Sequence, residues 1–257
     1  MRRSKTLEKI RAGKMVAVAA LGHFHPPYVT LAAHYGYDCI WFDLEHRAMG
    51  QRETQALTAF CHLADIDLMI RSPSHEPTKL NRCLEDGASG IMLQMIDTPE
   101  QAERAVQCLK FPPLGNRGLD GAGLDCNFSL KSDDNYTDDA NRETFICAQI
   151  ETPLAVENAD SIAAVEGIDV LLVGAGDLGL RIRKATGPVL SIDESIERIA
   201  AATAAHGKTL GAISIDRDGM KKRYDQGTRF LVAASEFMAL KNNLEGNMTL
   251  FKDVCGE

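Results

Sequence analysis

Long apolar runs, an excess of positive charge and closely spaced cysteine pairs are all missing from this sequence of 257 residues. No apolar run approaches the roughly 18 residues of a membrane span, and the basic residues 1–14 lead into only a short apolar stretch. We therefore expect no secretory signal and no membrane partner. The 28 Lys and Arg against 36 Asp and Glu leave a net charge of −8, which opposes nucleic acid as a partner. The composition favours a small molecule instead.

The seven cysteines are odd in number and spread evenly along the chain. They never fall two or three residues apart, as zinc and thioredoxin motifs require. This pattern indicates reduced thiols and therefore a soluble, cytoplasmic protein. The cysteines are Cys39, Cys61, Cys83, Cys108, Cys126, Cys147 and Cys255.

Short apolar runs alternate with helix-period segments along most of the chain. Eight such runs occur, and most are continuously apolar, which is typical of parallel strands covered on both faces. Eight strand-then-helix units predict an α/β fold, a (β/α)8 TIM barrel that forms a single domain over residues 1–257. The runs are Met15 to Ala20, Asp38 to Asp43, Asp67 to Arg71, Ser89 to Gln94, Phe145 to Ile150, Asp169 to Gly174, Thr209 to Ile213 and Arg229 to Ala234.

Three segments flank or interrupt this series. Residues Ser4 to Ala12 are amphipathic and predict an N-terminal helix, and a tail from Glu236 to Val254 follows the last strand. Residues 111–143 form a connection much longer than a barrel normally uses, and a structureless loop of that size is typical of a lid, a binding loop or an oligomer contact. We expect loops such as Gly118 to Asn141 to select the substrate.

The C-terminal ends of barrel strands converge on one mouth, where barrel enzymes build their active sites. The fifth and sixth predicted strands lead into Glu151 and Asp177. Both carboxylates can bind one hard divalent cation, and Mg²⁺, Mn²⁺ or Co²⁺ suits them better than Zn²⁺, which prefers nitrogen and sulfur ligands. The alternative is that each carboxylate only caps the helix that follows it.

Further polar groups end strands at the same mouth. His46 follows Asp43 at a spacing where a carboxylate can hold an imidazole in one tautomer and raise its basicity. Arg71 ends an apolar run, so its guanidinium can meet a carboxylate or a developing oxyanion there, the alternative being a buried structural ion pair. His23 and His25 follow the first strand and are the next candidates. The stretch Gly174-Ala175-Gly176-Asp177 offers backbone N–H groups that can hold a carboxylate.

These motifs, in this order, resemble the class II pyruvate aldolases of the HpcH/HpaI aldolase family, which cleave 4-hydroxy-2-oxo acids. The resemblance extends over most of residues 5–240, and several linked motifs are more specific than any one of them. The matching stretches are Tyr37 to His46 (YDCIWFDLEH), Ile70 to Pro73 (IRSP), Cys83 to Glu100 (CLEDGASGIMLQMIDTPE), Lys110 to Gly118 (KFPPLGNRG), Gln149 to Asp160 (QIETPLAVENAD) and Val165 to Leu178 (VEGIDVLLVGAGDL).

The resemblance implies a role for each of these site residues. It places the metal ligands on Glu151 and Asp177, the catalytic histidine on His46 with Asp43 beside it, and the enolate-stabilising arginine on Arg71. It also implies that Gln149 binds pyruvate and that the backbone of Gly176 and Asp177 holds the pyruvate carboxylate. The family is usually a hexamer, a trimer of dimers that exchange their last helix, which the tail would supply here.

The reaction expected from this resemblance is reversible aldol cleavage of a 4-hydroxy-2-oxo acid, of the 2-keto-3-deoxy sugar acid type, to pyruvate and an aldehyde. A divalent cation chelated by pyruvate makes the C3 proton removable, and Arg71 helps to stabilise the enolate. His46, directly or through water, exchanges the proton of the C4 hydroxyl. No lysine ends a predicted strand, which opposes a Schiff-base route.

Departures from the family pattern bear on the choice of acceptor. Ala175 and Gly176 replace the usual proline and alanine before the metal aspartate, Gly179 replaces a frequent serine, and Gln94 replaces a proline. Three alternatives stay open. They are a citrate-lyase-like enzyme acting on acyl-CoA esters, an oxaloacetate-type decarboxylase, and a non-catalytic binder of 2-oxo acids that keeps the two metal ligands without needing His46.

Overall fold

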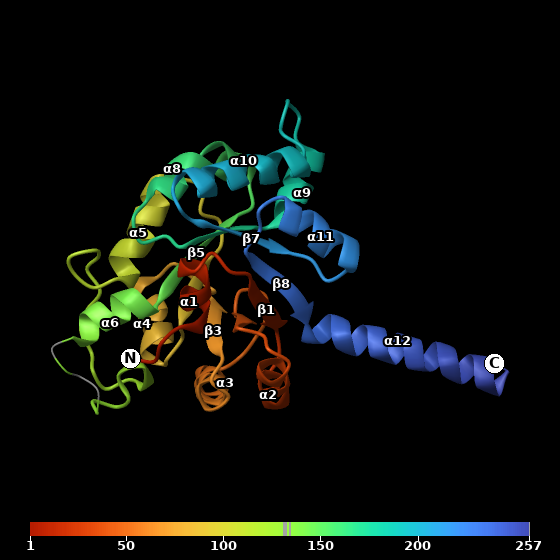
Figure 1. Cartoon of the computed structure of the whole chain (residues 1–257), viewed down its shortest axis with the longest axis horizontal. Helices are drawn as coiled ribbons and strands as arrows, with labels where there is room; N and C mark the ends of the chain where they lie inside the picture. The colour runs from red at the N-terminus through yellow and green to blue at the C-terminus, as the bar shows by residue number, and fades with distance from the viewer. Residues whose placement is uncertain (131–132, 134, 257) are drawn as a thin grey trace.

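Eight parallel strands close into one barrel in the computed structural model, which describes residues 1–130, 133 and 135–256 (Figure 1). The strands follow one another in sequence order, and β1 pairs with β8 to complete the ring. The predicted single-domain (β/α)8 barrel is confirmed. The strands are β1 Val16–Leu21, β2 Cys39–Asp43, β3 Asp67–Arg71, β4 Gly90–Leu93, β5 Phe145–Ile150, β6 Val170–Val173, β7 Thr209–Ile213 and β8 Phe230–Ser235.

Helices connect the strands and begin at capping signals in the sequence. At Ser191, the hydroxyl accepts from the backbone N–H of Glu194 at 3.3 Å, while the Glu194 carboxylate accepts from the N–H of Ser191 at 2.8 Å. The helices are α1 Lys5–Arg11, α2 Pro26–His34, α3 Gln51–Leu63, α4 Pro77–Glu85, α5 Pro99–Leu109, α6 Tyr136–Glu143, α7 Pro153–Glu157, α8 Ala159–Ala164, α9 Ala175–Lys184, α10 Ile192–Ala205, α11 Arg217–Asp225 and α12 Glu236–Cys255, with a 3-10 turn η1 at Leu124–Cys126.

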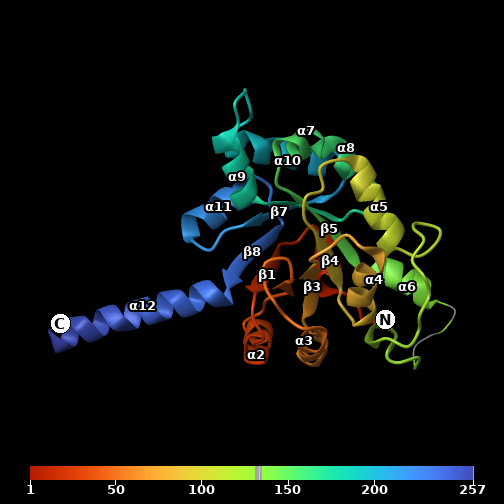
Figure 2. The same ribbon diagram turned by 180° about the vertical axis from the view of Figure 1, so that it is seen from behind.

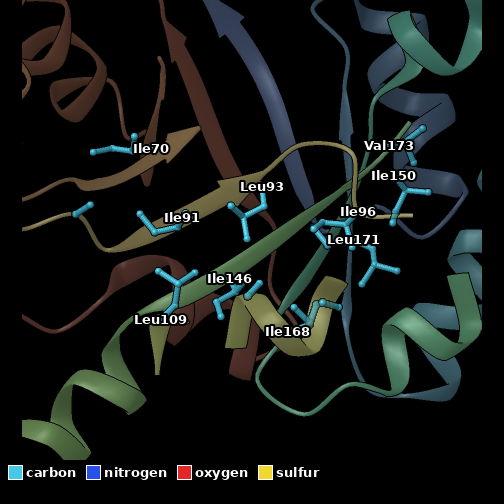
Figure 3. Close-up of a cluster of buried hydrophobic side chains, with 14 of the residues drawn as sticks. Ile70, Ile91, Leu93, Ile96, Leu109, Ile146, Ile150, Ile168, Leu171 and Val173 are labelled. Carbon is cyan, nitrogen blue, oxygen red and sulfur yellow. The ribbon is translucent and has the colours of Figure 1, made fainter. Parts of the chain in front are cut away.

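Two apolar layers stabilise the barrel, because side chains alternate between the two faces of each strand. The outer layer lies between the strands and the helices and includes Ile91 and Leu93 of β4 and Ile146 of β5 (Figure 3). The inner layer fills the barrel itself with side chains such as Met92 and Phe145. The interior is therefore a packed core, and only the ends of the barrel are open to a ligand.

Helix α1 closes the N-terminal end of the barrel. Leu7 packs against the inner layer and is 3% exposed. The buried carboxylate of Asp67, at the start of β3, accepts hydrogen bonds from the Ser4 hydroxyl at 2.7 Å and from the Thr6 N–H at 2.8 Å. Since this end is covered, the C-terminal mouth is the end of the barrel that remains for a site.

The expectation that residues 111–143 form a structureless loop is wrong. The segment contains η1 and α6, and it buries its own apolar cluster, which includes Phe111, Cys126 and Tyr136. It leads from the end of α5 to the first residue of β5 and packs Gly123 against the carbonyl of Glu85 at the end of α4. Within one chain the described part of this segment therefore lies at the N-terminal end of the barrel, where it does not border the mouth. Residues 131, 132 and 134 of this segment lie outside the described residues.

Helix α12 projects away from the body of the barrel in both views (Figures 1 and 2). Large apolar side chains spaced three or four residues apart stay exposed on it: Phe237, Leu240, Leu244, Met248 and Phe251. In the part of the chain that the structure describes, no helix combines the length and the apolar character needed to cross a membrane.

Candidate active site

The site arises where the inward-facing side chains of the strands change from apolar to polar. Because side chains alternate with a period of two, the residue two positions after an inner-layer side chain also faces inward. At the C-terminal mouth that next residue is polar on four neighbouring strands. The successive inward positions are Trp41 and Asp43 on β2, Met69 and Arg71 on β3, Met92 on β4 and Gln94 directly after it, and Cys147 and Gln149 on β5.

Arg71 is held by two carboxylates, one at the end of β2 and one in the loop that follows β2. Its Nε and Nη2 atoms donate to the two carboxylate oxygens of Asp43 at 3.0 and 2.7 Å, and its Nη1 lies 2.9 Å from Oε2 of Glu45. The guanidinium also stacks over the ring of Trp41, 5.0 Å from its centroid. Burial alone would raise the pKa of Asp43, but the hydrogen bonds and charge of Arg71 lower it. Arg71 thus takes part in a buried ion pair that also lies at the mouth.

The structure does not show the expected contact between Asp43 and the imidazole of His46. Oδ1 of Asp43 instead accepts hydrogen bonds from the backbone N–H groups of Glu45 at 3.0 Å and His46 at 3.2 Å. The ring Nε2 of His46 lies 3.6 Å from Oε2 of Glu45, and the side chain is 55% exposed. Asp43 therefore shapes the loop after β2, and the nearest acid to the imidazole is Glu45, to which the sequence analysis assigned no role.

Glu151 is the most buried carboxylate of the mouth, with 3% of its surface exposed. Its Oε1 accepts from the N–H of Met95 at 2.8 Å, and its Oε2 accepts from Nε2 of Gln149 at 2.5 Å. Burial raises the pKa of Glu151, and the negative charges of Asp177 and Glu45 raise it further against the effect of these hydrogen bonds. Thr152, not Glu151, caps α7, so the helix-cap alternative is excluded for Glu151.

Asp177 and Gly176 lie in the first turn of α9. The Asp177 carboxylate pairs with Arg181, one turn later, at 2.8 Å and is 48% exposed, so it does not cap the helix either. The first backbone hydrogen bond of this helix runs from the N–H of Leu178 to the carbonyl of Gly174. The preceding N–H groups, including those of Gly176 and Asp177, are therefore oriented to bind an anion.

Gly174 permits the close approach between the end of β6 and the end of β5. A Cβ atom at this position would lie 2.6 Å from Cβ of Glu151, 2.8 Å from its Oε2 and 2.9 Å from Nε2 of Gln149. Only glycine leaves the space that these two side chains occupy. By contrast, a Cβ atom at Gly176 would meet no atom within 4 Å.

Glu236 is a residue of the mouth to which the sequence analysis assigned no role there. It follows β8 directly, is 4% exposed, and its Oε1 accepts from the N–H of Gly22 at 2.9 Å and bonds Nδ1 of His23 at 2.7 Å. Inspection of the residues that follow the last predicted strand would have identified it. The other histidine candidate of the first loop, His25, precedes α2 and makes no side-chain cap.

The chemistry of the donor set fits a hard divalent cation. Three carboxylates, those of Glu151, Asp177 and Glu45, interact electrostatically, and the buried Oε1 atoms of Gln94 and Gln149 have no hydrogen-bond partner among the described residues. All of these groups offer oxygen, which Mg²⁺ and Mn²⁺ prefer. Across the described ranges, no three His, Cys, Asp or Glu side chains converge as a metal cluster. If Glu151 and Asp177 were its protein ligands, the cation would have further coordination positions for water and substrate oxygens.

The fold is a closed (β/α)8 barrel, and the candidate site lies at the C-terminal ends of its strands, where barrel enzymes build their active sites. A family model described as HpcH/HpaI aldolase/citrate lyase matches residues 21–242. The chain belongs to this family, and it is a carbon–carbon lyase of the aldolase type.

Named relatives and solved structures agree with this assignment. The chain is 32% identical over 216 residues to a 4-hydroxy-2-oxovalerate aldolase of Novosphingobium aromaticivorans, covering 80% of this chain and 79% of that protein. It is 31% identical over 230 residues to a 2-keto-3-deoxy-L-rhamnonate aldolase of Salmonella paratyphi B, with 87% and 84% covered. The crystal structure of an HpcH/HpaI aldolase from Desulfitobacterium hafniense superposes with a TM-score of 0.87 at 28% identity, covering 95% of both chains.

Proposed function

We propose that this chain catalyses the reversible aldol cleavage of a 4-hydroxy-2-oxo acid, of the 2-keto-3-deoxy sugar acid type, to pyruvate and an aldehyde, with a divalent cation as cofactor. The observation that carries the proposal is the position of Glu151 at the mouth, where this carboxylate is 3% exposed, is held by Met95 and Gln149, and interacts with the negative charges of Asp177 and Glu45. A cation would compensate these charges. The names of the two relatives support the substrate class. A more distant barrel of 16% identity and TM-score 0.56, the citrate lyase beta subunit from M. tuberculosis, was solved with oxaloacetate and magnesium.

The side chains of the mouth have complementary tasks in this reaction. When bound by Glu151 and Asp177, a divalent cation supplies a Lewis acid that withdraws electron density from a 2-oxo acid. Arg71, fixed by its bonds to Asp43 and Glu45, places a positive charge where the enolate oxygen develops. The amide of Gln149 orients the 2-oxo acid, and the N–H groups at the start of α9 hold its carboxylate.

Cleavage also requires a base that removes the proton of the C4 hydroxyl. The sequence-based prediction assigns this task to His46, whose ring is exposed at the mouth.

Exchange of the C3 protons of pyruvate for deuterium tests the proposed function without knowledge of the aldehyde. Purified protein with added Mn²⁺ or Mg²⁺ should exchange these protons, and Glu151→Gln should abolish the exchange and the binding of Mn²⁺ measured by calorimetry. Glu157→Gln is the matched control, because it makes the same change at an exposed position of the adjacent α7.

The outcomes of this experiment are distinct. Exchange that needs the cation and Glu151 supports the enzyme, whereas Mn²⁺ and pyruvate binding without any exchange supports the alternative of a non-catalytic binder. Exchange that survives Glu151→Gln would refute the proposed metal site. Pyruvate release from a panel of 2-keto-3-deoxy sugar acids and 4-hydroxy-2-oxo diacids then identifies the aldehyde partner.

We also propose that the chain assembles as a homo-oligomer, a hexamer built as a trimer of dimers, in which α12 packs on a second copy. The projection of α12 and its exposed apolar residues support this arrangement, since a helix with such a stripe gains stability by covering it. Leu244, 68% exposed, lies in the middle of the stripe. Analytical ultracentrifugation should find a hexamer for the native chain and smaller species for Leu244→Glu. A native monomer would refute the proposal.

A further inference from the structure

Arg181 contacts the candidate site, yet the proposed reaction gives it no task. It lies on α9 one turn after Asp177, and its Nη1 donates to Oδ1 of that carboxylate at 2.8 Å. The side chain of Arg181 is 34% exposed and that of Asp177 is 48% exposed. An acid followed four residues later by a base is the favourable order for a pair on a helix, because the acid lies nearer the N-terminus. The pair therefore holds a half-exposed carboxylate in one orientation.

The other half of the guanidinium contacts the loop that follows β4. Nη2 of Arg181 lies 3.4 Å from Sδ of Met95. The backbone N–H of Met95 in turn donates to Oε1 of Glu151 at 2.8 Å. Met95 has a φ of 54°, a strained conformation for a residue other than glycine, so its contacts hold it there against that strain. Arg181 thus contacts one proposed metal ligand directly and the residue that holds the other.

The bond from Arg181 leaves Asp177 free to bind a cation. It uses Oδ1 only, and no described residue donates to the other oxygen, Oδ2. Among the described residues, Arg181 is also the only cation that pairs with either Glu151 or Asp177. One guanidinium beside two carboxylates leaves a negative charge in excess, and its repulsion of a second cation is weakened by solvent because it is one-third exposed. The arrangement therefore favours a guanidinium that supports a divalent cation over one that replaces it.

We propose that Arg181 is a positioning residue of the metal site, which fixes the carboxylate of Asp177 for the cation and links α9 to the loop that holds Glu151. The inference rests on the proposed function. A half-exposed carboxylate that rotates freely loses conformational entropy when it binds a cation, whereas one already fixed by a partner does not. Partners that hold metal-binding carboxylates in this way contribute about 10–100-fold to metal affinity or activity.

Binding of Mn²⁺ without substrate, measured by calorimetry and by the electron paramagnetic resonance signal of free Mn²⁺, tests the inference. We expect Arg181→Met to raise the Kd for Mn²⁺ by about 10-fold or more, because methionine keeps the apolar part of the side chain and removes the charge and the donors. Arg183→Met is the matched control, since it removes the same charge from an exposed position of the same helix. An unchanged or lowered Kd in Arg181→Met, or equal weakening in both variants, overturns the inference.

Arg181→Lys supplies a second measurement that keeps the charge. A lysine four residues after Asp177 can still pair with it, so this variant should recover most of the Mn²⁺ affinity that Arg181→Met loses. A merely structural role of Arg181 would lower the melting temperature of both variants without changing the Mn²⁺ affinity of the folded protein. A folded Arg181→Lys protein that binds Mn²⁺ as weakly as Arg181→Met overturns the inference.

The C3 exchange of pyruvate separates failure of this inference from failure of the proposed function. Because Arg181 acts through Asp177 and not on the substrate, exchange by Arg181→Met should be slow at low Mn²⁺ and recover at saturating Mn²⁺. Exchange that stays slow at saturating Mn²⁺ would show that Arg181 acts on the substrate, which contradicts a positioning role. If the native chain neither binds Mn²⁺ nor exchanges C3 protons, the proposed function itself has failed, and the inference with it.

Discussion

Replacement of Gly174 by alanine tests whether the close approach of β6 to the side chains of β5 builds the site. The added methyl group would lie 2.6 Å from Cβ of Glu151 and 2.9 Å from Nε2 of Gln149, both shorter than van der Waals contact. Both residues are at most 4% exposed, so the added methyl group must displace packed side chains. Overpacking of this kind costs about 1–3 kcal/mol. In a domain of this size that corresponds to a fall of about 2–12 °C in Tm.

Thermal and urea unfolding of Gly174→Ala and Gly176→Ala measure this effect, because the two variants make the same chemical change near one another. A Cβ atom at Gly176 meets no atom within 4 Å, and alanine is a better helix former, so this variant should be as stable as the native chain or more stable by up to about 1 kcal/mol. Displacement of Glu151 should also make Gly174→Ala bind Mn²⁺ more weakly. Equal stability of the two variants would refute the packing argument.

Two further predictions concern buried ion pairs. The lowered pKa of Asp43 means that its pairing with Arg71 contributes stability above the ordinary carboxyl pKa of 3.8, and that this stability is lost as the pH falls through the lowered folded-state value. The gap in unfolding free energy between the native chain and Asp43→Asn should shrink in acid, and a gap that is constant with pH would contradict this. Arg117→Met should cost about 3–5 kcal/mol in urea unfolding, because it leaves Asp125, whose side chain is 0% exposed, without its cation. A loss below about 1 kcal/mol would show that the pair is not needed.

Short-range patterns in the sequence were sufficient to predict the barrel and the end of it at which the candidate site residues lie. Continuous apolar runs between capped helices indicate buried parallel strands, and the residue that ends each strand is then known to face the mouth. Arg71, Gln149 and Glu151 were predicted at this end on that ground, and the structure places them there. This works because strand period and helix capping depend on residues that are close in the chain.

The partners of those side chains were decided only by the tertiary structure. Asp43 faces Arg71 because β2 and β3 pair in register at these two residues, and this pairing takes Asp43 away from the imidazole of His46. Glu236 meets His23 because closure of the barrel brings the last strand beside the first. Contacts between residues this far apart in the sequence depend on how the strands pair, and no local pattern of residues determines that pairing.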